Sequence, residues 1–323
     1  MLQLKRRPAI ALAALCMLAP LSALADYPSR PLTFIVNFPA GGASDRMARI
    51  FGQALAEELR QTVVIENKPG AAGAIGMVAA ARAEPDGYTF TLGALSTSIT
   101  QPLITKTPYD MKRDFTPISL IALAPSVLVV PAASPFKTVD DIVAAAKAAP
   151  GKLNFGSGGI GTFAQLTGEM LNQVAGIQTT HIPYKGGGEA LKDVIANRID
   201  MITLEPPNAM PQLRAGTLRA IAYTGARRSP LLPDVPTFIE SGYKDLVGTN
   251  SWAVYMPAGV PGAVVETFHK ALVKAMENPR LVAQFAELGA EAVHTTPGEL
   301  REFVAAETAR YAAIIKKAKI HAD

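Results

Sequence analysis

Hydrophobic residues recur along the first part of the chain in two alternating patterns. Short apolar runs typical of buried strands occupy residues 32–38, 62–66 and 88–92. Between them, Met47, Ile50, Phe51, Ala54, Leu55 and Leu59 follow helical spacing, and residues 75–83 also predict a helix. This alternation of strand and helix favours a parallel sheet covered by helices.

The same alternation resumes in the second part of the chain, which ends in helices. We expect strands at residues 126–130, 153–155, 179–183, 201–204, 218–223 and 252–256. We expect helices at residues 139–147, 163–174, 189–197, 261–276, 280–288 and 297–318. The last of these begins with the capping box Thr296-Pro297-Gly298-Glu299, which has proline at the first helical position. Because no flexible linker or low-complexity tract separates the halves, we expect two α/β lobes between which the chain crosses more than once.

The first 25 residues are typical of an export signal. A basic segment at residues 5–7 precedes an apolar stretch at residues 9–24, and Ala23-Leu24-Ala25 fits the small-residue cleavage site. A membrane anchor is disfavoured, because the stretch is shorter than the about 20 residues of a spanning helix and contains Pro20. Leu15 precedes Cys16 where a lipidation site has a small residue. We therefore expect a signal peptide, residues 1–25, that is cleaved after Ala25.

Composition and charge narrow the function classes. Of the 323 residues, 49% are hydrophobic and 18% charged, a composition that excludes intrinsic disorder. The formal charge is +4, but three of the 31 basic residues belong to the predicted signal, which leaves 28 against 27 acidic residues. A net charge near +1 argues against a nucleic-acid partner. Cys16 is the only cysteine, so the mature chain lacks thiol nucleophiles, disulfides and cysteine-bound metals.

Two glycine-rich turns with related sequences carry the candidate chemistry. Residues 37–45 (N-F-P-A-G-G-A-S-D) and residues 154–162 (N-F-G-S-G-G-I-G-T), 117 positions later, each connect a predicted strand to a predicted helix. Glycine pairs let backbone N–H groups approach a ligand, and Ser44 or Asp45 in one turn and Thr162 in the other are expected to cap the helices. The free N–H groups of a helix start attract anions, and each hydrogen bond to a charged group contributes about 1.5–3 kcal/mol. Two such turns across a cleft would hold a carboxylate without arginine, although both can also be simple tight turns.

Other loops add candidate residues. Tyr184 can stack on a planar ligand or form a hydrogen bond to it, and Lys185 is either a ligand-binding cation or a solvated surface charge. Glu205 can meet an amino group of a ligand or remain exposed, with exposure favoured, and Ser96 is placed near the cleft. We expect no metal site.

Signatures of cofactor binding and of catalysis are weak or missing. Residues 156–161 match G-x-G-x-x-G, but no acidic residue follows about 20 positions later, so we expect no nucleotide cofactor. The four histidines are far apart, and there is no G-x-S-x-G elbow and no phosphate-binding G-x-x-x-x-G-K-[ST] loop. An exported hydrolase or isomerase that uses His181 and Glu205 remains a less favoured alternative.

A series of motifs along the chain resembles the Bug family, the extracytoplasmic solute-binding proteins of tripartite tricarboxylate transporters. The motifs are Y-P-x-R-P at 27–31, I-V-N-F-P-A-G-G-A-S-D at 35–45, E-N-K-P-G-A-A-G at 66–73, E-P-D-G-Y-T at 84–89, G-G-I-G-T at 158–162, I-P-Y-K-G at 182–186, L-P-D-V-P-T at 232–237, E-S-G at 240–242 and P-A-G-V-P at 257–261. The resemblance extends over residues 27–323.

The resemblance implies a fold and a set of site residues. It implies a type II periplasmic binding protein fold, with lobe one at residues 26–124 plus about 245–323 and lobe two at about 125–244. The family binds a ligand carboxylate at the two turns, often through water. The matching residues are Phe38, Pro39, Ala40, Gly41, Gly42 and Asp45 in lobe one, and Ser157, Gly158, Gly159, Thr162, Tyr184, Lys185 and Gly186 in lobe two. Three residues depart from the family pattern: Asn37, Gln165 and Glu205.

The resemblance also implies the function. We expect a periplasmic receptor, monomeric and without cofactor, that captures a small organic carboxylate and delivers it to membrane permease subunits. A receptor that senses the ligand for a membrane signalling partner is the alternative that the sequence does not separate from it.

Overall fold

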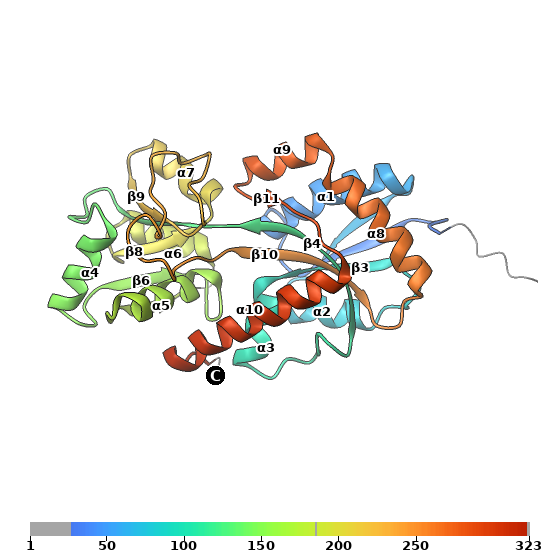
Figure 1. Cartoon of the computed structure of the whole chain (residues 1–323), viewed down its shortest axis with the longest axis horizontal. Helices are drawn as coiled ribbons and strands as arrows, with labels where there is room; N and C mark the ends of the chain where they lie inside the picture. Colours follow the sequence, from blue (N-terminus) through green and yellow to red (C-terminus); the bar gives the residue numbers. More distant parts are fainter. Residues whose placement is uncertain (1–26, 185, 322–323) are drawn as a thin grey trace, which may run out of the picture.

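The computed structural model describes residues 27–184 and 186–321, which form two lobes side by side (Figure 1). Each lobe contains one sheet, and helices cover both. The predicted signal peptide and its cleavage site lie outside the described residues. No described helix combines the length and the apolar character needed to cross a membrane.

Lobe one is built on a six-stranded sheet with the order β11-β4-β10-β3-β1-β2. Its strands are β1 (Leu32–Val36), β2 (Val63–Asn67), β3 (Thr89–Ala94), β4 (Phe115–Ala124), β10 (Asn250–Pro257) and β11 (Glu291–Ala292). Its helices are α1 (Ala43–Leu59), η1 (Ala71–Gly73), α2 (Ala74–Ala81), η2 (Ser96–Thr100), α3 (Gln101–Ile104), α8 (Gly262–Met276), α9 (Pro279–Glu287) and α10 (Pro297–Ala318). The pairs of β1 with β2 and β3 are parallel, but β10 runs antiparallel to β3 and β4, so the prediction of a parallel sheet was right only in part.

Lobe two is built on a five-stranded sheet with the order β7-β6-β8-β5-β9. Its strands are β5 (Val127–Pro131), β6 (Asn154–Ser157), β7 (Thr180–Pro183), β8 (Met201–Leu204) and β9 (Leu218–Tyr223). Its helices are α4 (Val139–Ala148), α5 (Phe163–Ala175), α6 (Gly187–Ile195) and α7 (Pro206–Arg214). The expected architecture of two α/β lobes is confirmed.

The chain crosses between the lobes from β4 to β5 and again from β9 to β10 (Figure 1). Buried Thr224 connects the two crossings: its Oγ1 accepts from Ser126 N at 2.8 Å and donates to Gly248 O at 2.8 Å. The backbone of Thr224 bonds to the same two residues. The crossings therefore form one hydrogen-bonded unit, which we call the hinge.

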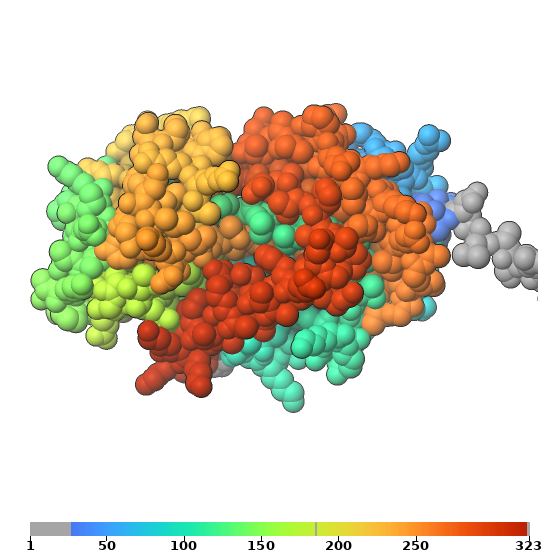
Figure 2. Space-filling view, viewed as in Figure 1, coloured from blue at the N-terminus to red at the C-terminus, as the bar shows by residue number. Residues whose placement is uncertain are grey.

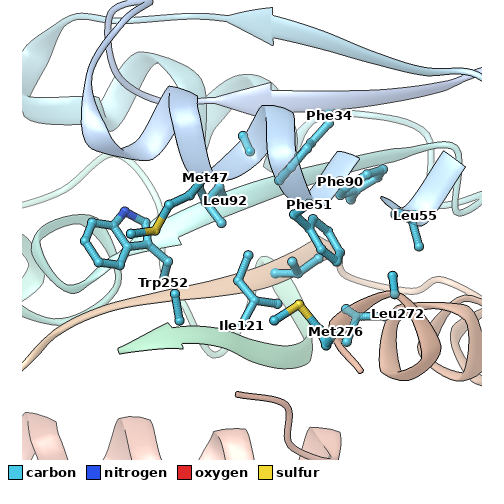
Figure 3. Packing of buried hydrophobic residues seen from close by; sticks show 14 of the residues in the cluster. Phe34, Met47, Phe51, Leu55, Phe90, Leu92, Ile121, Trp252, Leu272 and Met276 are labelled. Carbon is cyan, nitrogen blue, oxygen red and sulfur yellow. The ribbon is translucent and has the colours of Figure 1, made fainter. Parts of the chain in front are cut away.

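Aromatic side chains dominate the core of lobe one (Figure 3). Phe34 stacks on Phe90 with ring centroids 4.4 Å apart, and the edge of Phe51 packs on Phe34. Trp252 lies beside Met47 at one end of this core, and its indole Nε1 donates to Ser44 Oγ at 2.8 Å. Because Ser44 lies in the first turn of α1, the core holds the start of this helix in a fixed position.

Helix α10 contacts both lobes. It begins with the predicted capping box at Thr296 and Glu299, which is confirmed. Toward its end, Tyr311, Ile314 and Ile315 join a buried apolar cluster that includes Leu95 and Ile99 of lobe one and Phe163 and Met170 of lobe two. The lobes are thus joined by apolar contacts on the α10 side as well as by the hinge.

Candidate functional site

The first glycine turn connects β1 to α1 and is organised by Asp45. The carboxylate of Asp45 is buried and accepts hydrogen bonds from Gly41 N at 2.9 Å, Asn67 Nδ2 at 2.9 Å and Arg49 Nε at 3.0 Å. Burial alone would raise the pKa of this carboxyl, but the hydrogen bonds from Arg49, Gly41 and Asn67 outweigh it and hold the pKa below its ordinary value. Asp45 is therefore ionised and engaged within lobe one, where it holds the turn in shape.

The second glycine turn connects β6 to α5 and is organised by Ser157 and Gln165. The buried Ser157 hydroxyl accepts from Gly159 N at 3.1 Å and lies 2.6 Å from His181 Nε2. Gln165 Oε1 accepts from Gly161 N at 2.7 Å, and Thr162 Oγ1 donates to Gly159 O at 2.7 Å. Most polar side chains of this turn thus hold its own backbone.

The Ser157–His181 pair is the feature closest to a catalytic arrangement. Burial lowers the pKa of the His181 imidazole to about 4, so the ring is neutral at pH 7. The Ser157 side chain is fully buried and also bonds to the backbone of Gly159, and no carboxylate among the described residues bonds to His181. This geometry is that of a structural hydrogen bond at a strand end.

The same type of hydrogen bond stabilises both turns, but the residues that form it are not the ones that the sequence repeat aligns. The third residue of each helix, Asp45 in α1 and Gln165 in α5, accepts the N–H of the residue that precedes the N-cap, Gly41 or Gly161. These positions are 120 residues apart, not 117, since Asn37 follows its strand whereas Asn154 begins one. The matching letters of the repeat therefore do not occupy matching positions.

The predicted capping residues were wrong for α1 and right for α5 in position only. Gly42 is the N-cap of α1, because Ser44 is bonded to Trp252 and Asp45 to Gly41. Thr162 does occupy the N-cap of α5, but its hydroxyl donates to Gly159 O and does not cap the helix.

The starts of α1 and α5 therefore keep free hydrogen-bond donors. Neither helix has a side-chain cap, and the backbone N–H groups of residues 43–45 and 163–165 have no hydrogen-bond partner among the described residues. By contrast, side chains cap α4, α9 and α10. Free N–H groups and the helix dipole favour an anion at each of these two uncapped starts.

A third loop packs against the second turn. A Cβ at Gly158 would lie 2.9 Å from Gly187 N, so the two backbones touch there. Gly186 is the N-cap of α6, and Lys185 lies outside the described residues. The Tyr184 hydroxyl donates to Asp193 Oδ2 at 2.8 Å, which leaves the ring of Tyr184 as the part available to a ligand.

Two hollows lie between the lobes beside these turns. A wide, open groove of about 650 Å³ is lined by Ala72 and Gln101 of lobe one and by Gly159, Ile160, Pro183, Tyr184 and Glu189 of lobe two. A smaller, more enclosed crevice of about 10 Å³, which has room for about one water molecule, is lined by Ala43, Arg46, Met47, Ala124, Trp252 and Leu288 of lobe one and by Glu205, Pro207 and Asn208 of lobe two. In Figure 2 a hollow is visible between the yellow and gold segments of lobe two and the orange-red segments of lobe one.

Of the remaining candidate residues that the structure describes, Glu205 alone lines one of these two hollows. Pro39, Ala40, Gly41 and Gly42 are exposed, and Phe38 is half-buried against the core of lobe one. Glu205, for which exposure was favoured, is half-buried at the N-cap of α7 and faces the crevice. Ser96 begins η2 and lines neither hollow. No group of three His, Cys, Asp or Glu side chains within residues 27–184 and 186–321 can hold a metal ion.

The lobes touch at two seams. At the η2 seam, Thr100 Oγ1 donates to Gly161 O at 2.7 Å and Gln101 Nε2 to Ile160 O at 3.4 Å. At the α7 seam, Gly289 of lobe one lies against the ring of Pro206, where a Cβ at Gly289 would be 2.9–3.0 Å from three ring atoms. Contacts at both seams mean that the structure has the lobes drawn together.

The sequence did not predict three residues that lie at the interface between the lobes: Arg46, Thr100 and Gln101. Arg46 directly follows Asp45 on α1, and its position on the exposed side of the apolar pattern gave no sign of the crevice. Thr100 and Gln101 belong to η2 and α3, a segment for which no element was predicted.

Comparison with known proteins identifies relatives along nearly the whole chain. The family model described as "Tripartite tricarboxylate transporter family receptor" matches residues 47–320. The protein BugT of Bordetella pertussis is 34% identical over 301 residues, 93% of this chain and 92% of that protein.

Solved structures agree with that result. The structure of R. palustris Rpa4515 with adipate has a TM-score of 0.83 at 31% identity and covers 92% of this chain and 99% of its own. MatC from Rhodopseudomonas palustris with bound malate has a TM-score of 0.78 at 28% identity and covers 90% of this chain and 100% of its own.

Proposed function

This chain belongs to the tripartite tricarboxylate transporter receptor family, and from that premise we propose that it captures a small organic carboxylate between its lobes and delivers it to membrane permease subunits. The resemblance to the Bug family is thereby confirmed, and members of this family are periplasmic solute-binding receptors. Relatives whose structures carry adipate and malate support a carboxylate as the ligand.

The observation that carries the proposal is the pair of uncapped helix starts. Helix α1 of lobe one keeps free N–H donors and its first residue, Ala43, lines the crevice, whereas helix α5 of lobe two keeps free N–H donors after a turn that lines the groove. A carboxylate held by both would bind only when the lobes are together, so binding would shift the population toward the closed state.

We assign the contacts to the two turns and the third loop. In lobe one these are Phe38, Pro39, Ala40, Gly41 and Gly42 with the first N–H groups of α1; in lobe two they are Gly158, Gly159, Thr162, Tyr184, Lys185 and Gly186. The fully buried Ser157 acts indirectly, through its hydrogen bond to Gly159 N. Asp45 acts indirectly, through the shape of the first turn.

The remaining features of the proposal follow the sequence. We propose lobe boundaries near residues 124 and 245, export with cleavage after Ala25, a monomeric receptor, and no catalytic activity. Ser96 is assigned to the rim of the cleft.

The substitution A43P tests the assigned site with little risk to the fold. Ala43 is the first residue of α1, where proline is well tolerated, and Gly42 before it has the extended backbone (ψ 174°) that a following proline requires. The substitution removes one free N–H donor and adds no charge. We expect it to weaken carboxylate binding by about 10-fold to 150-fold, the equivalent of one hydrogen bond of about 1.5–3 kcal/mol to a charged group.

The measurement is isothermal titration calorimetry with succinate, malate, citrate and adipate. G262P is the matched control, because Gly262 is the exposed first residue of α8, a helix that lines neither hollow. A wild-type protein that binds none of these acids would refute the proposed function. Equal affinities of A43P and G262P would refute the assignment of the ligand to the start of α1.

A further inference from the structure

One peptide group of the hinge is held from both sides. The carbonyl of Val247 and the N–H of Gly248 belong to the same planar trans peptide, so they point in opposite directions. The N–H donates to Thr224 O at 3.0 Å, and the carbonyl accepts from Arg310 Nη1 of α10 at 2.6 Å. Within residues 27–184 and 186–321, Arg310 is the only donor that reaches Val247 O. Arg310 therefore ties the crossing from β9 to β10 to helix α10.

The side chain of Arg310 is fixed by its neighbours on α10. Its Nη2 atom donates to Glu307 Oε2 at 2.7 Å and to the Tyr311 hydroxyl at 2.8 Å. Tyr311 is fully buried and the Glu307 side chain is 17% exposed, so water screens these contacts only in part. A planar guanidinium group serves several acceptors at once, whereas the single ammonium group of lysine serves fewer. We call Glu307, Arg310, Tyr311 and the Val247 carbonyl the clasp.

The hinge peptide also touches the start of α5. A Cβ at Gly248 would lie 3.0 Å from Phe163 Cε2 and 3.2 Å from Phe163 Cζ, so the ring packs directly on the hinge backbone. Phe163 is the first residue of α5, the helix whose free N–H groups we assign to the ligand carboxylate. Phe163 and Tyr311 also belong to one buried apolar cluster. The start of α5, the hinge and the clasp thus form a continuous series of contacts.

Arg310 does not belong to the site itself. It lines neither the groove nor the crevice, so its substitution removes no contact to a ligand in these hollows. Its Nε atom is buried and has no hydrogen-bond partner among the described residues, which costs free energy. The clasp is therefore less stable than its three short hydrogen bonds alone would make it, and a movement of the hinge can release it.

We propose that Arg310 is a positioning residue for closure of the lobes: the clasp forms fully only when the lobes are together, and it raises the population of the closed state. This inference rests on the proposed function. Helix α10 packs on β4 and η2 of lobe one, so opening of the lobes turns the Val247 carbonyl away from Arg310. Because the acid binds only the closed state, its affinity scales with the population of that state.

Calorimetry on the mature chain tests this role with the tightest-binding acid among succinate, malate, citrate and adipate. R310Q removes the charge and most donors, and it is expected to weaken binding at least about tenfold. R310K keeps the charge and is expected to weaken binding at least about threefold. R301Q is the matched control, because Arg301 is an exposed residue of the same helix that lines neither hollow, and its affinity is expected to stay within about twofold of wild type.

A kinetic measurement separates positioning from a purely structural role. Cys16 is the only cysteine of the chain, so E287C and R214C add two fluorophore sites on exposed residues of α9 and α7, which belong to different lobes (Figure 1). When excess unlabelled receptor removes the acid, the lobes of R310Q are expected to open faster than those of wild type by about the factor lost in affinity. A purely structural Arg310 lowers the free energy of unfolding in urea and changes neither the affinity nor the opening rate.

The possible outcomes are distinct. If folded R310Q binds the acid with wild-type affinity, or opens at the wild-type rate, the inference is wrong and the proposed function stands. If R310Q does not fold, R310K compared with R301K decides by the same two measurements. If the wild type binds none of the four acids, the proposed function fails, and this inference fails with it.

Discussion

Closure of the lobes depends on a close contact that only glycine allows at position 289. In the α7 seam, a Cβ on residue 289 would lie 2.9 Å from Pro206 Cγ and 3.0 Å from Pro206 Cβ and Cδ. Ordinary carbon contacts are about 3.5–4.0 Å long, so the substitution G289A would push the seam apart by about 0.5–1 Å. The proline ring is rigid and cannot turn away from the added methyl group.

The free-energy cost of G289A has two parts, backbone strain and overpacking, and a control variant separates them. Gly289 has a φ of +67°, and alanine in this left-handed conformation costs about 1–2 kcal/mol wherever it occurs. Overpacking of the seam adds about 1–3 kcal/mol, and only in the closed state. Gly216 has the same φ of +67° at an exposed site with nothing within 4 Å of its Cβ position, so G216A carries the first cost alone.

The expected result is a difference in affinity between the two variants. If the ligand binds only the closed state, the overpacking penalty passes directly into the dissociation constant and weakens binding by about 5-fold to 150-fold in G289A. Calorimetry with the tightest-binding acid of the panel gives the ratio of the two dissociation constants. Urea unfolding shows whether alanine costs the same free energy of unfolding in G289A and G216A. Small-angle scattering is expected to show a larger radius of gyration for G289A than for G216A in the presence of ligand. Equal affinities in two folded variants would refute the argument that the α7 seam closes on the ligand.

Three other substitutions test parts of the structure that support the site. D45N is expected to lower the free energy of unfolding by about 1.5–3 kcal/mol at pH 7. Because the pKa of Asp45 in the folded protein lies below its ordinary value, this difference between variant and wild type shrinks as the pH falls below about 4. Equal stability of the two proteins at pH 7, measured by urea unfolding, would contradict the role of Asp45. The pKa of His181 is about 4 in the folded protein against 6.5 in the unfolded chain, so the free energy of unfolding of the wild type is expected to fall as the pH is lowered from about 6.5 to about 4. H181Q is expected to lack this part of the loss. The same pH dependence of stability in H181Q as in the wild type would count against a buried, neutral His181. T224V leaves Ser126 N and Gly248 O without their side-chain partner in the hinge. Thermal or urea unfolding is expected to show that the free energy of unfolding falls by at least about 2 kcal/mol. A variant as stable as the wild type would show that the hinge does not depend on these hydrogen bonds.

Local chemistry made much of the fold predictable from the sequence. The predicted strand at residues 201–204 and the predicted helix at residues 297–318 match β8 and α10 to the residue. The start of α10 is determined by four adjacent residues, since the Thr296 side chain caps Glu299 N and the Glu299 side chain caps Thr296 N. Where the signal is contained in one such turn, no knowledge of the tertiary structure is needed.

Two elements escaped prediction because their prolines argue against them locally. Strand β4 contains Pro117, which is tolerated because it pairs with Tyr255 at an irregularity in the register with β10. Helix α7 contains Pro206 and Pro207 at its first two positions, where the missing N–H groups cost nothing. Both elements matter for the site, since β4 leads into the hinge and α7 presents Glu205 to the crevice.

The site was predictable in its backbone and not in its side chains. The two glycine turns were identified from the sequence, but Ser44 or Asp45 was expected to cap α1. Ser44 instead accepts from Trp252, 208 positions away, and Asp45 accepts from Gly41 N. Arg46 and Glu205 face one crevice from different lobes, a proximity that depends on how the lobes close and that no local pattern encodes.

A crystal structure of the protein saturated with a dicarboxylate tests the central claim most directly. The account predicts one carboxylate within about 3 Å of backbone N–H groups from both lobes, at residues 38–45 and 157–165, either directly or through a single bridging water. A ligand bound to the turns of one lobe only, or in a cavity that neither turn borders, would contradict it.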